Sequence, residues 1–288
     1  MSLSGFRQRA NSAPVRTAGI ILAAFVLVML MPLVILGPVD LTDGTGTLDF
    51  ETLTYGLPWQ IVLTLALLLC VFVIGWWRRS LLTSQLDRRG LRPLYITLAY
   101  PLFGIVTFTA LYGAEGSGRG PFEILALVLC LNFFVGLSEE LLFRGIVFGA
   151  LREKTRLASA IAISSVLFGL LHLVNAGAGQ DMQQTLFQVI NATALGVLFC
   201  ALAISANSLW PAVLLHMVWN AYAMMGVVVA ENMGQIPGAY AETPDLSPWS
   251  LLLPSLILLI ALAILYGYRQ THHVRLTAIV PGPVDGAA

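Results

Sequence analysis

The sequence predicts an all-α fold: a polytopic bundle of about eight transmembrane helices with both termini on the cytoplasmic side. Hydrophobic residues make up 58% of the 288 positions and charged residues only 10%, well below the roughly 25% charged residues of soluble domains. The apolar segments are long and continuous and do not alternate at every second residue, which favours helices over a closed barrel. The basic residues also gather in alternate loops. Together these observations place the chain in a lipid bilayer.

Eight segments have the length and composition of membrane spans. About 20 apolar residues cross a hydrocarbon core of roughly 30 Å, and the segments near that length or beyond it are 17–37, 59–77, 94–112, 122–150, 157–174, 185–205, 209–230 and 250–268. The first has a longer apolar core than a secretory signal and no small-residue cleavage site after it, so we interpret it as a membrane helix. The fourth is too long for a straight crossing and is interrupted by charges.

The distribution of charge predicts the orientation. Basic residues precede the first span, join spans two and three and spans four and five, and follow the last: Arg7, Arg9, Arg16, Arg78, Arg79, Arg88, Arg89, Arg92, Arg152, Lys154, Arg156, Arg269 and Arg275. The alternate loops hold Asp40, Asp43, Asp49, Glu51, Asp181, Glu231, Glu242 and Asp245, with Arg119 as the one exception. Because basic loops stay cytoplasmic, we expect a single transmembrane domain over 1–268 and a short polar cytoplasmic tail over 269–288.

Span four carries three charged side chains within six residues, Glu139, Glu140 and Arg144. Unpaired and facing lipid, they would together cost on the order of 8–10 kcal/mol, so they must face the bundle interior or water. Glu140 and Arg144 are four residues apart and can pair on one helix face. Glu139 points about 100° away from Glu140 and has no evident local partner, which makes it the candidate for chemistry.

Two other spans hold the remaining candidates. His172 ends span five, and His216 and Asn220 share one face of span seven. Each alone could be an interhelical hydrogen-bonding residue, worth about 0.6 kcal/mol. Independent structural uses would scatter over eight spans, however, and these six polar residues occupy three. The other polar residues at membrane depth are assigned to packing between helices: Asn132, Gln188 and Asn191.

Three motifs in these spans resemble those of a known family. Glu139-Glu140-x-x-x-Arg144, Phe168-x-x-x-His172 and His216-x-x-x-Asn220 are similar, in order and on separate helices, to the motifs of the CPBP family. That family contains the type II CAAX prenyl endopeptidases and the bacteriocin-processing and abortive-infection-type membrane proteins. The flanks 138–145 and 208–212 are also typical of it. The resemblance covers about 120–220, and the protease core it implies covers about 120–230.

The resemblance implies an intramembrane protease of the cell membrane. Glu139 and His172 would position and deprotonate a water molecule. His216 and Asn220 would stabilise the oxyanion formed when that water attacks a peptide carbonyl, while Glu140 and Arg144 would brace the site. The expected partners are the lipid bilayer and a membrane-associated peptide or protein substrate, prenylated or not, with no nucleic acid.

The cofactor stays open at this point. Glu139, His172 and His216 would also suit zinc, with a fourth position left for water, and family members are commonly called metalloproteases. The His-Glu-x-x-His motif of the zincins is absent from the sequence, and a metal-free glutamate mechanism has also been argued for the family. Metal-free catalysis is slightly favoured.

Two other functions are compatible with the same residues. In a proton-coupled carrier, Glu139 and the histidines would relay protons, although the inverted repeats common in transporters are not visible. A non-catalytic scaffold or immunity protein could keep the helix framework and its motifs.

One geometric difficulty concerns every function in which Glu139, His172 and His216 must lie close together. At 1.5 Å per residue, Glu139 and His172 lie roughly 20 Å from the cytoplasmic ends of their spans and His216 only about 10 Å, so straight helices would keep them apart.

Overall fold

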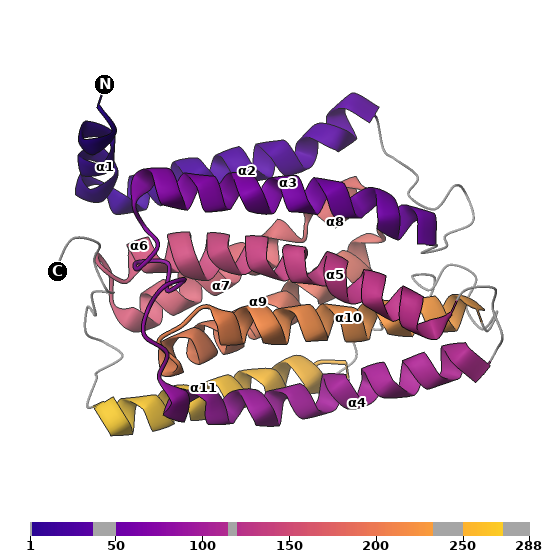
Figure 1. Ribbon diagram of the computed structural model, residues 1–288. Helices are drawn as coiled ribbons and strands as arrows, with labels where there is room; N and C mark the ends of the chain where they lie inside the picture. The colour runs from indigo at the N-terminus through magenta and orange to yellow at the C-terminus, as the bar shows by residue number, and fades with distance from the viewer. Residues whose placement is uncertain (1, 37–49, 115–119, 233–249, 273–288) are drawn as a thin grey trace.

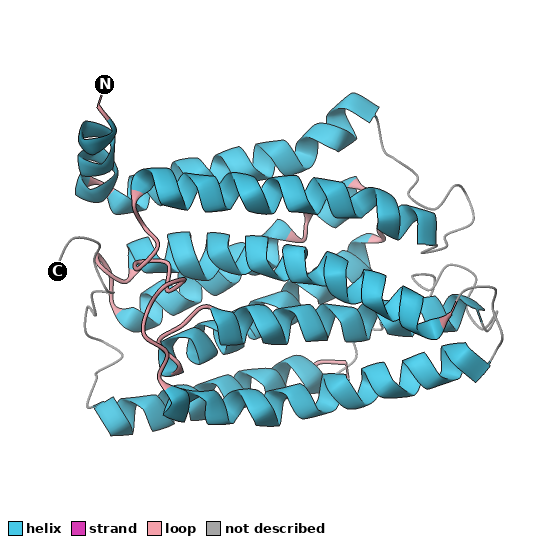
Figure 2. Ribbon diagram, in the orientation of Figure 1, coloured by secondary structure: helices cyan, strands magenta, loops and turns pink. Residues whose placement is uncertain are grey.

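The computed structural model describes residues 2–36, 50–114, 120–232 and 250–272, and its regular secondary structure in these ranges is entirely helical (Figure 2). Eight of the described segments are long and apolar enough to cross a membrane: Pro14–Met31, Gly56–Ile74, Arg88–Ala114, Pro121–Leu151, Leu157–Gly177, Met182–Ser205, Trp210–Ala230 and Leu252–His272. The all-α prediction and the eight spans are therefore confirmed. Residues 269–272 continue the last helix, and the rest of the predicted polar tail lies outside the described residues, as do most of the acidic loop positions.

The helices follow one another along the chain as α1 (Leu3–Ser12), α2 (Pro14–Leu36), α3 (Phe50–Ile74), η1 (Arg88–Leu91), α4 (Arg92–Ala114), α5 (Pro121–Glu140), η2 (Leu141–Phe148), α6 (Gly149–Leu151), α7 (Leu157–Leu171), α8 (Val174–Gly177), α9 (Met182–Ser205), α10 (Trp210–Asn232) and α11 (Leu252–His272). The long helices run side by side, and α1 lies across the end of the bundle (Figure 1). Helix α10 packs against α4, α5 and α9, whereas α9 packs against α7, α10 and α11.

Burial within the protein separates central spans from peripheral ones. In the α9 span 61% of residues are buried, against 17% in the α2 span and 22% in the α11 span. The exposed positions of the peripheral helices are large and apolar, as at Ile96 and Phe103 of α4. Such side chains face hydrocarbon at little cost in a bilayer, so hydropathy alone does not identify the core of this protein. The buried centre belongs to α5, η2, α7, α9 and α10.

Close helix contacts in this centre depend on glycine. A Cβ atom on Gly136 of α5 would lie 3.3 Å from the backbone nitrogen of Met217 and from the carbonyl oxygen of Val213, both on α10. A Cβ on Gly169 of α7 would lie 2.7 Å from the carbonyl oxygen of Val189 on α9. Small residues let membrane helices approach until their backbones touch. These two glycines therefore set the spacing of α5 with α10 and of α7 with α9.

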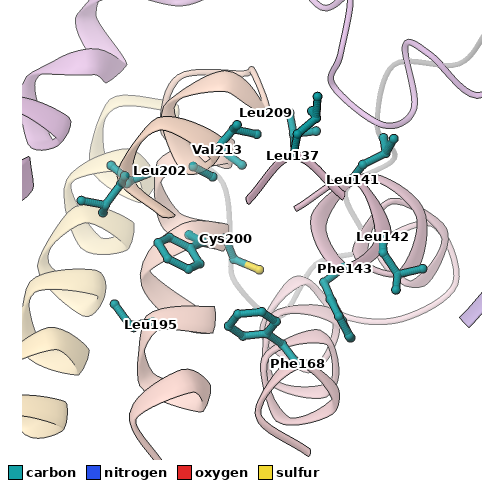
Figure 3. Packing of buried hydrophobic residues seen from close by; sticks show 14 of the residues in the cluster. Leu137, Leu141, Leu142, Phe143, Phe168, Leu195, Cys200, Leu202, Leu209 and Val213 are labelled. Atoms are coloured by element: carbon teal, nitrogen blue, oxygen red, sulfur yellow. The ribbon is translucent and has the colours of Figure 1, made fainter. Parts of the chain in front are cut away.

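Apolar side chains from the four central spans fill the space between these helices (Figure 3). The labelled members of this cluster are Leu137, Leu141, Leu142, Phe143, Phe168, Leu195, Cys200, Leu202, Leu209 and Val213. They come from α5, η2, α7, α9, α10 and the turn before α10. The cluster packs the four central spans against one another. The polar residues of span four lie within this apolar packing.

The segment 75–87, between α3 and η1, covers the start of α10. The backbone nitrogen of Leu209 donates to the carbonyl oxygen of Leu81 at 3.1 Å, and the indole nitrogen of Trp210 donates to the carbonyl oxygen of Leu82 at 3.2 Å. Leu81 is buried in a left-handed backbone conformation, with φ of 61°. These two hydrogen bonds fix the start of α10 against segment 75–87.

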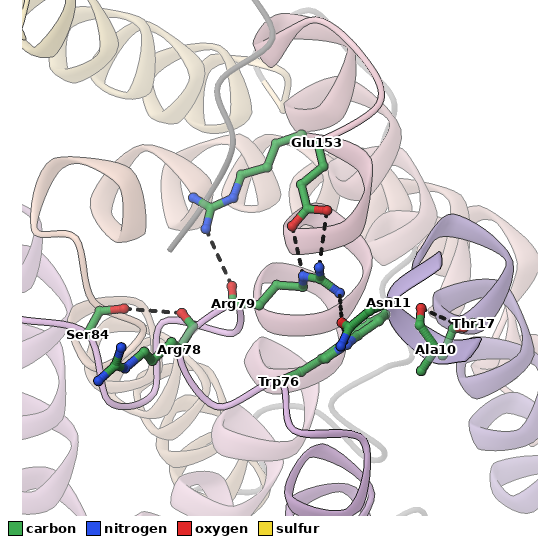
Figure 4. A network of polar contacts seen from close by, with 9 residues as sticks. Ala10, Asn11, Thr17, Trp76, Arg78, Arg79, Ser84 and Glu153 are labelled. Carbon is green, nitrogen blue, oxygen red and sulfur yellow. Dashed lines mark hydrogen bonds and ion pairs between the residues drawn. The ribbon is translucent and has the colours of Figure 1, made fainter. Parts of the chain in front are cut away.

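A polar cluster holds this end of the bundle together (Figure 4). The guanidinium of Arg79 donates to both carboxylate oxygens of Glu153, at 2.8 and 3.2 Å, and to the side-chain oxygen of Asn11 at 3.0 Å. The indole of Trp76 donates to the same Asn11 oxygen at 2.9 Å. Burial lowers the pKa of Arg152 to about 10, an effect that the neighbouring Glu153 carboxylate opposes. These contacts tie α1 and segment 75–87 to the end of span four.

Candidate active site

Span four changes its helix type directly after Glu139 and Glu140. Helix α5 ends at Glu140, and the next eight residues, Leu141–Phe148, form the π-helix η2, every residue of which is buried. Short π-helical turns within α-helices frequently accompany functional sites. Here the wider turns carry Arg144 completely into the protein, where its side chain is 0% exposed.

Three buried side chains form a hydrogen-bonded chain across α5, η2 and α10. Arg144 Nη1 donates to Glu140 Oε1 at 3.0 Å, as the spacing of four residues predicts. The same carboxylate oxygen lies 2.8 Å from His216 Nδ1. Because this oxygen already accepts a hydrogen bond from a guanidinium, we assign the proton of the second bond to His216. The sequence did not predict the bond between Glu140 and His216.

Glu139 faces the other nitrogen of the same imidazole. Its Oε2 atom is buried, has no hydrogen-bond partner among the described residues, and lies 3.7 Å from His216 Nε2. That separation is too long for a direct hydrogen bond. Two polar groups at such a separation commonly interact through a bridging oxygen atom, from water or from a substrate. His216 therefore stands between the two carboxylates of span four.

The second histidine of the motifs, His172, contacts the same phenylalanine ring as His216 does. His172 follows the last residue of α7, and its Nδ1 is 3.0 Å from the carbonyl oxygen of Phe168. The Phe168 ring meets the imidazole of His172 edge-on at 5.2 Å and that of His216 at 5.6 Å between centroids. His172 forms no hydrogen bond or ion pair with Glu139 in the described part of the chain. Asn220 follows His216 by one helical turn and is partly buried.

The expected mismatch in depth does not occur. The 3.7 Å contact places Glu139 and His216 at the same level. Residue counts from the helix ends therefore do not give the relative levels of these side chains. The structure thus joins Glu139, Glu140, Arg144 and His216 by direct contacts and His172 through Phe168.

Helix α9 supplies a wall of the site that the sequence did not reveal. The Phe199 ring stacks on the imidazole of His216, with 4.9 Å between centroids and 11° between planes. The guanidinium carbon of Arg144 lies 4.2 Å from the centre of the Phe168 ring and 5.1 Å from that of Phe199. Such contacts favour a buried cation. A phenylalanine in an apolar span gives no sequence signal of this kind.

The other polar residues at depth remain outside the site, and they differ in the hydrogen bonds that they form. Asn191 donates to the carbonyl oxygen of Phe187 within its own helix, so this bond does not join two helices. An amide four residues after a helical carbonyl can always reach it, and no partner helix is needed. Gln188 does accept a hydrogen bond from Asn175 of α8 at 2.8 Å. Asn132 reaches Met224 Sδ of α10 at 3.6 Å.

The residues proposed as zinc ligands do not form a three-ligand site in this arrangement. No group of three or more His, Cys, Asp or Glu side chains within the described ranges converges closely enough to hold a metal ion. The Nδ1 atom of His216 is bonded to Glu140, an arrangement that metal-bound histidines share, so the separation of the candidate ligands decides the question. Catalytic zinc sites usually take three protein ligands. The described side chains are not arranged as such a site.

Comparison with known proteins agrees with the motifs. Residues 121–222 match the family model of the type II CAAX prenyl endopeptidase Rce1-like proteins, a segment that contains all six polar site residues. The chain is also 34% identical over 125 residues to the UPF0177 protein YxdF of Lactococcus lactis subsp. lactis (strain IL1403), which is 38% of this chain and 68% of the relative. The chain belongs to the Rce1-like family. The resemblance inferred from the motifs is confirmed.

The name of a second relative concerns activity. This relative is the Bacillus subtilis (strain 168) protein named "Putative membrane peptidase YdiL", 32% identical over 104 residues. The aligned segment covers 36% of this chain and 38% of that relative's length. No solved structure matches the chain significantly. The family and the eight apolar helices identify a multi-pass membrane protein.

Proposed function

We propose that this chain is an intramembrane endopeptidase of the cell membrane, which hydrolyses a peptide bond in a membrane-associated protein or peptide with Glu139 as its base. One observation carries the proposal. A buried carboxylate oxygen, Glu139 Oε2, has no hydrogen-bond partner among the described residues and faces an imidazole nitrogen 3.7 Å away. Leaving a buried acceptor without a partner costs stability, and a catalytic base needs such an open position. The peptidase name of the Bacillus relative supports the same reaction class.

The first step activates water. Glu139 takes a proton from a water molecule as the water oxygen bonds to the carbonyl carbon of the substrate. The Nδ1 atom of His172 points at the carbonyl oxygen of Phe168, so Nδ1 carries the ring proton. The Nε2 atom of the neutral ring is then an acceptor. We assign it the second hydrogen bond of the attacking water.

The attack of water leaves a negative charge on the former carbonyl oxygen, and hydrogen-bond donors must stabilise this oxyanion. His216 Nε2 and the side-chain amide of Asn220 are the donors we assign to it. Because Nδ1 of His216 already donates to Glu140, Nε2 can donate only when the ring carries two protons.

The tetrahedral intermediate then collapses. Glu139 returns its proton to the leaving nitrogen as the carbon–nitrogen bond breaks, and the products are a carboxylic acid and an amine. One water molecule is consumed, and no oxidant, reductant or metal is required. Glu140 and Arg144 do not exchange protons in this scheme. Glu140 holds His216 in place, and Arg144 balances the charge of Glu140.

The substrate is best sought with matched peptides. We would incubate the purified full-length protein in lipid nanodiscs with a peptide ending in a Cys-aliphatic-aliphatic-X sequence, once farnesylated and once with a free thiol. A membrane-spanning peptide without cysteine completes the panel, and mass spectrometry identifies the cleaved bond. Cleavage of the farnesylated form alone identifies a prenyl-dependent enzyme, and cleavage of the others identifies a broader intramembrane protease.

Two variants control this experiment. Glu139→Gln keeps the shape of the side chain and removes the base, so we expect no cleavage by it. Glu123→Gln changes an exposed glutamate in the first turn of the same helix and should leave cleavage unchanged. Equal rates for the parent and Glu139→Gln would contradict the role of Glu139. A parent that cleaves no peptide of the panel would favour the non-catalytic scaffold.

A further inference from the structure

Phe199 differs from the other aromatic residues around the site in how it meets His216. It belongs to none of the three motifs, lies on α9 and is 1% exposed. The Phe168 ring meets both histidines edge-on, with planes at 80° and 85°. The Phe199 ring instead lies nearly parallel to the imidazole of His216, at 11° and 4.9 Å. Parallel aromatic contacts hold the plane of a ring as well as its position.

The orientation of His216 needs this additional contact. Its Nδ1 atom is fixed by Glu140 at 2.8 Å, but the terminal torsion of a histidine side chain is broad. A ring held at one nitrogen can still tilt about that hydrogen bond, and tilting moves Nε2 away from Glu139. Contact with a flat face on one side and with the edge of Phe168 on another prevents the tilt.

We propose that Phe199 is a positioning residue, which holds the imidazole plane of His216 so that Nε2 points into the space beside Glu139. This inference rests on the proposed function, because it is the reaction that gives the direction of Nε2 its importance. It adds a fourth helix to a site that the sequence assigned to three. Phe199 itself touches neither water nor substrate in this scheme.

The packing of α9 explains how Phe199 reaches the imidazole. Gly196 lies one turn before Phe199, and a Cβ atom there would be 2.9 Å from the Cα atom of Ser165 on α7 and 3.1 Å from Arg144 Nη2. The helix backbone therefore approaches η2 and α7 as closely as a glycine permits. A larger residue at position 196 would move α9 outward and separate the two stacked rings.

Substitution of Phe199 tests the proposal through a split between kcat and KM. Phe199→Leu keeps an apolar side chain and removes the flat face, whereas Phe199→Tyr keeps the face. Phe148→Leu is the matched control, since Phe148 is 0% exposed at the end of η2 and its ring contacts Arg152 instead of a histidine. We expect kcat for the peptide cleaved by the parent to fall about 10- to 100-fold in Phe199→Leu, with KM within about twofold. Phe199→Tyr should keep most of the parent kcat, and Phe148→Leu should keep all of it at a similarly lowered melting temperature.

A second measurement does not depend on cleavage. In protein labelled with nitrogen-15 at histidine, the Nδ1–H signal of His216, assigned by its loss in His216→Ala, should exchange slowly with water in the parent and in Phe148→Leu. It should broaden or exchange faster in Phe199→Leu, and Phe199→Met serves if the leucine variant does not fold. Parent-like kcat and an unchanged His216 signal in Phe199→Leu would overturn the inference. A parent without peptidase activity would instead defeat the proposed function, while the histidine signal still decides whether Phe199 holds the ring.

Discussion

At the scale of single residues, His216 connects the parts of the site. One of its nitrogens is bonded to Glu140, the other faces Glu139, and its ring packs against both Phe199 and Phe168. Glu140 consequently does more than balance Arg144, because it also sets which nitrogen of His216 is left for chemistry. A carboxylate that orients a histidine in this way is a familiar partner of catalytic imidazoles.

The pair of Glu140 and Arg144 gives a prediction about stability. Both side chains are 0% exposed, so removing one partner leaves a buried charge without its counterion. We expect Arg144→Ala to lower the free energy of unfolding by about 3–5 kcal/mol, measured by denaturant titration in detergent. Combining it with Glu140→Gln should restore part of the loss, since the second change removes the stranded charge. An Arg144→Ala protein as stable as the parent would show that the ion pair contributes nothing.

The sequence predicted this pair and missed the bond to His216 for one reason. Glu140 and Arg144 are neighbours on one helix, so their spacing fixes their geometry. Glu140 and His216 are 76 positions apart, and their contact depends on how far α10 is displaced along α5. That displacement is set by segment 75–87 and by Gly136, neither of which carries a chemical motif. The catalytic role of each residue remains a prediction until variants are assayed.

At the scale of elements, hydropathy located the spans to within a few residues, because each must carry apolar side chains across the same thickness of lipid. It did not indicate the π-helix η2, since hydropathy reports the polarity of Leu141–Phe148 and not the type of helix that it forms. It also did not distinguish α9, the most buried span, from the peripheral ones. Lipid and protein interior have similar polarity, so a helix has a similar hydropathy whether it faces lipid or the protein interior.

The contact of α5 with α10 yields a prediction about spacing. Gly136→Ala places a Cβ atom 3.3 Å from two backbone atoms of α10, tighter than ordinary packing, one turn from Glu139 on the same helix. We expect the two helices to separate slightly and kcat to fall by roughly tenfold or more, as sub-ångström misplacement of catalytic groups allows. Gly19→Ala on α2 is the control, because no atom lies within 4 Å of its Cβ position. Parent-like kcat for Gly136→Ala would show that the site tolerates a wider spacing.

At the scale of the whole molecule, the metal content distinguishes a zinc-dependent mechanism from a metal-free one. The described residues offer no group of three ligands, so we expect purified active protein to hold well below one equivalent of zinc by elemental analysis. Strong chelators should then leave turnover of a verified peptide unchanged in nanodiscs. One tightly held zinc per active chain, lost together with activity in His216→Ala, would contradict this expectation and leave the protease assignment intact.

The orientation of the molecule in its membrane remains a prediction from the basic loops. The polar cluster around Arg79 lies at the bundle end where those loops gather (Figure 4), and both ends of the described chain belong to basic segments. If this end is cytoplasmic, segment 75–87 is the part of the protein between the start of α10 and the cytoplasm. The proposed active site then lies within the bilayer beneath it.

The most direct test of the central claim follows the oxygen of water. Parent and Glu139→Gln are each incubated in oxygen-18 water with a peptide that the parent cleaves, and the fragments are weighed by mass spectrometry. We predict that the parent yields two fragments, with one oxygen-18 atom in the new carboxyl group, and that Glu139→Gln binds the peptide but yields neither fragment. Cleavage by Glu139→Gln at the parent's rate would contradict the account.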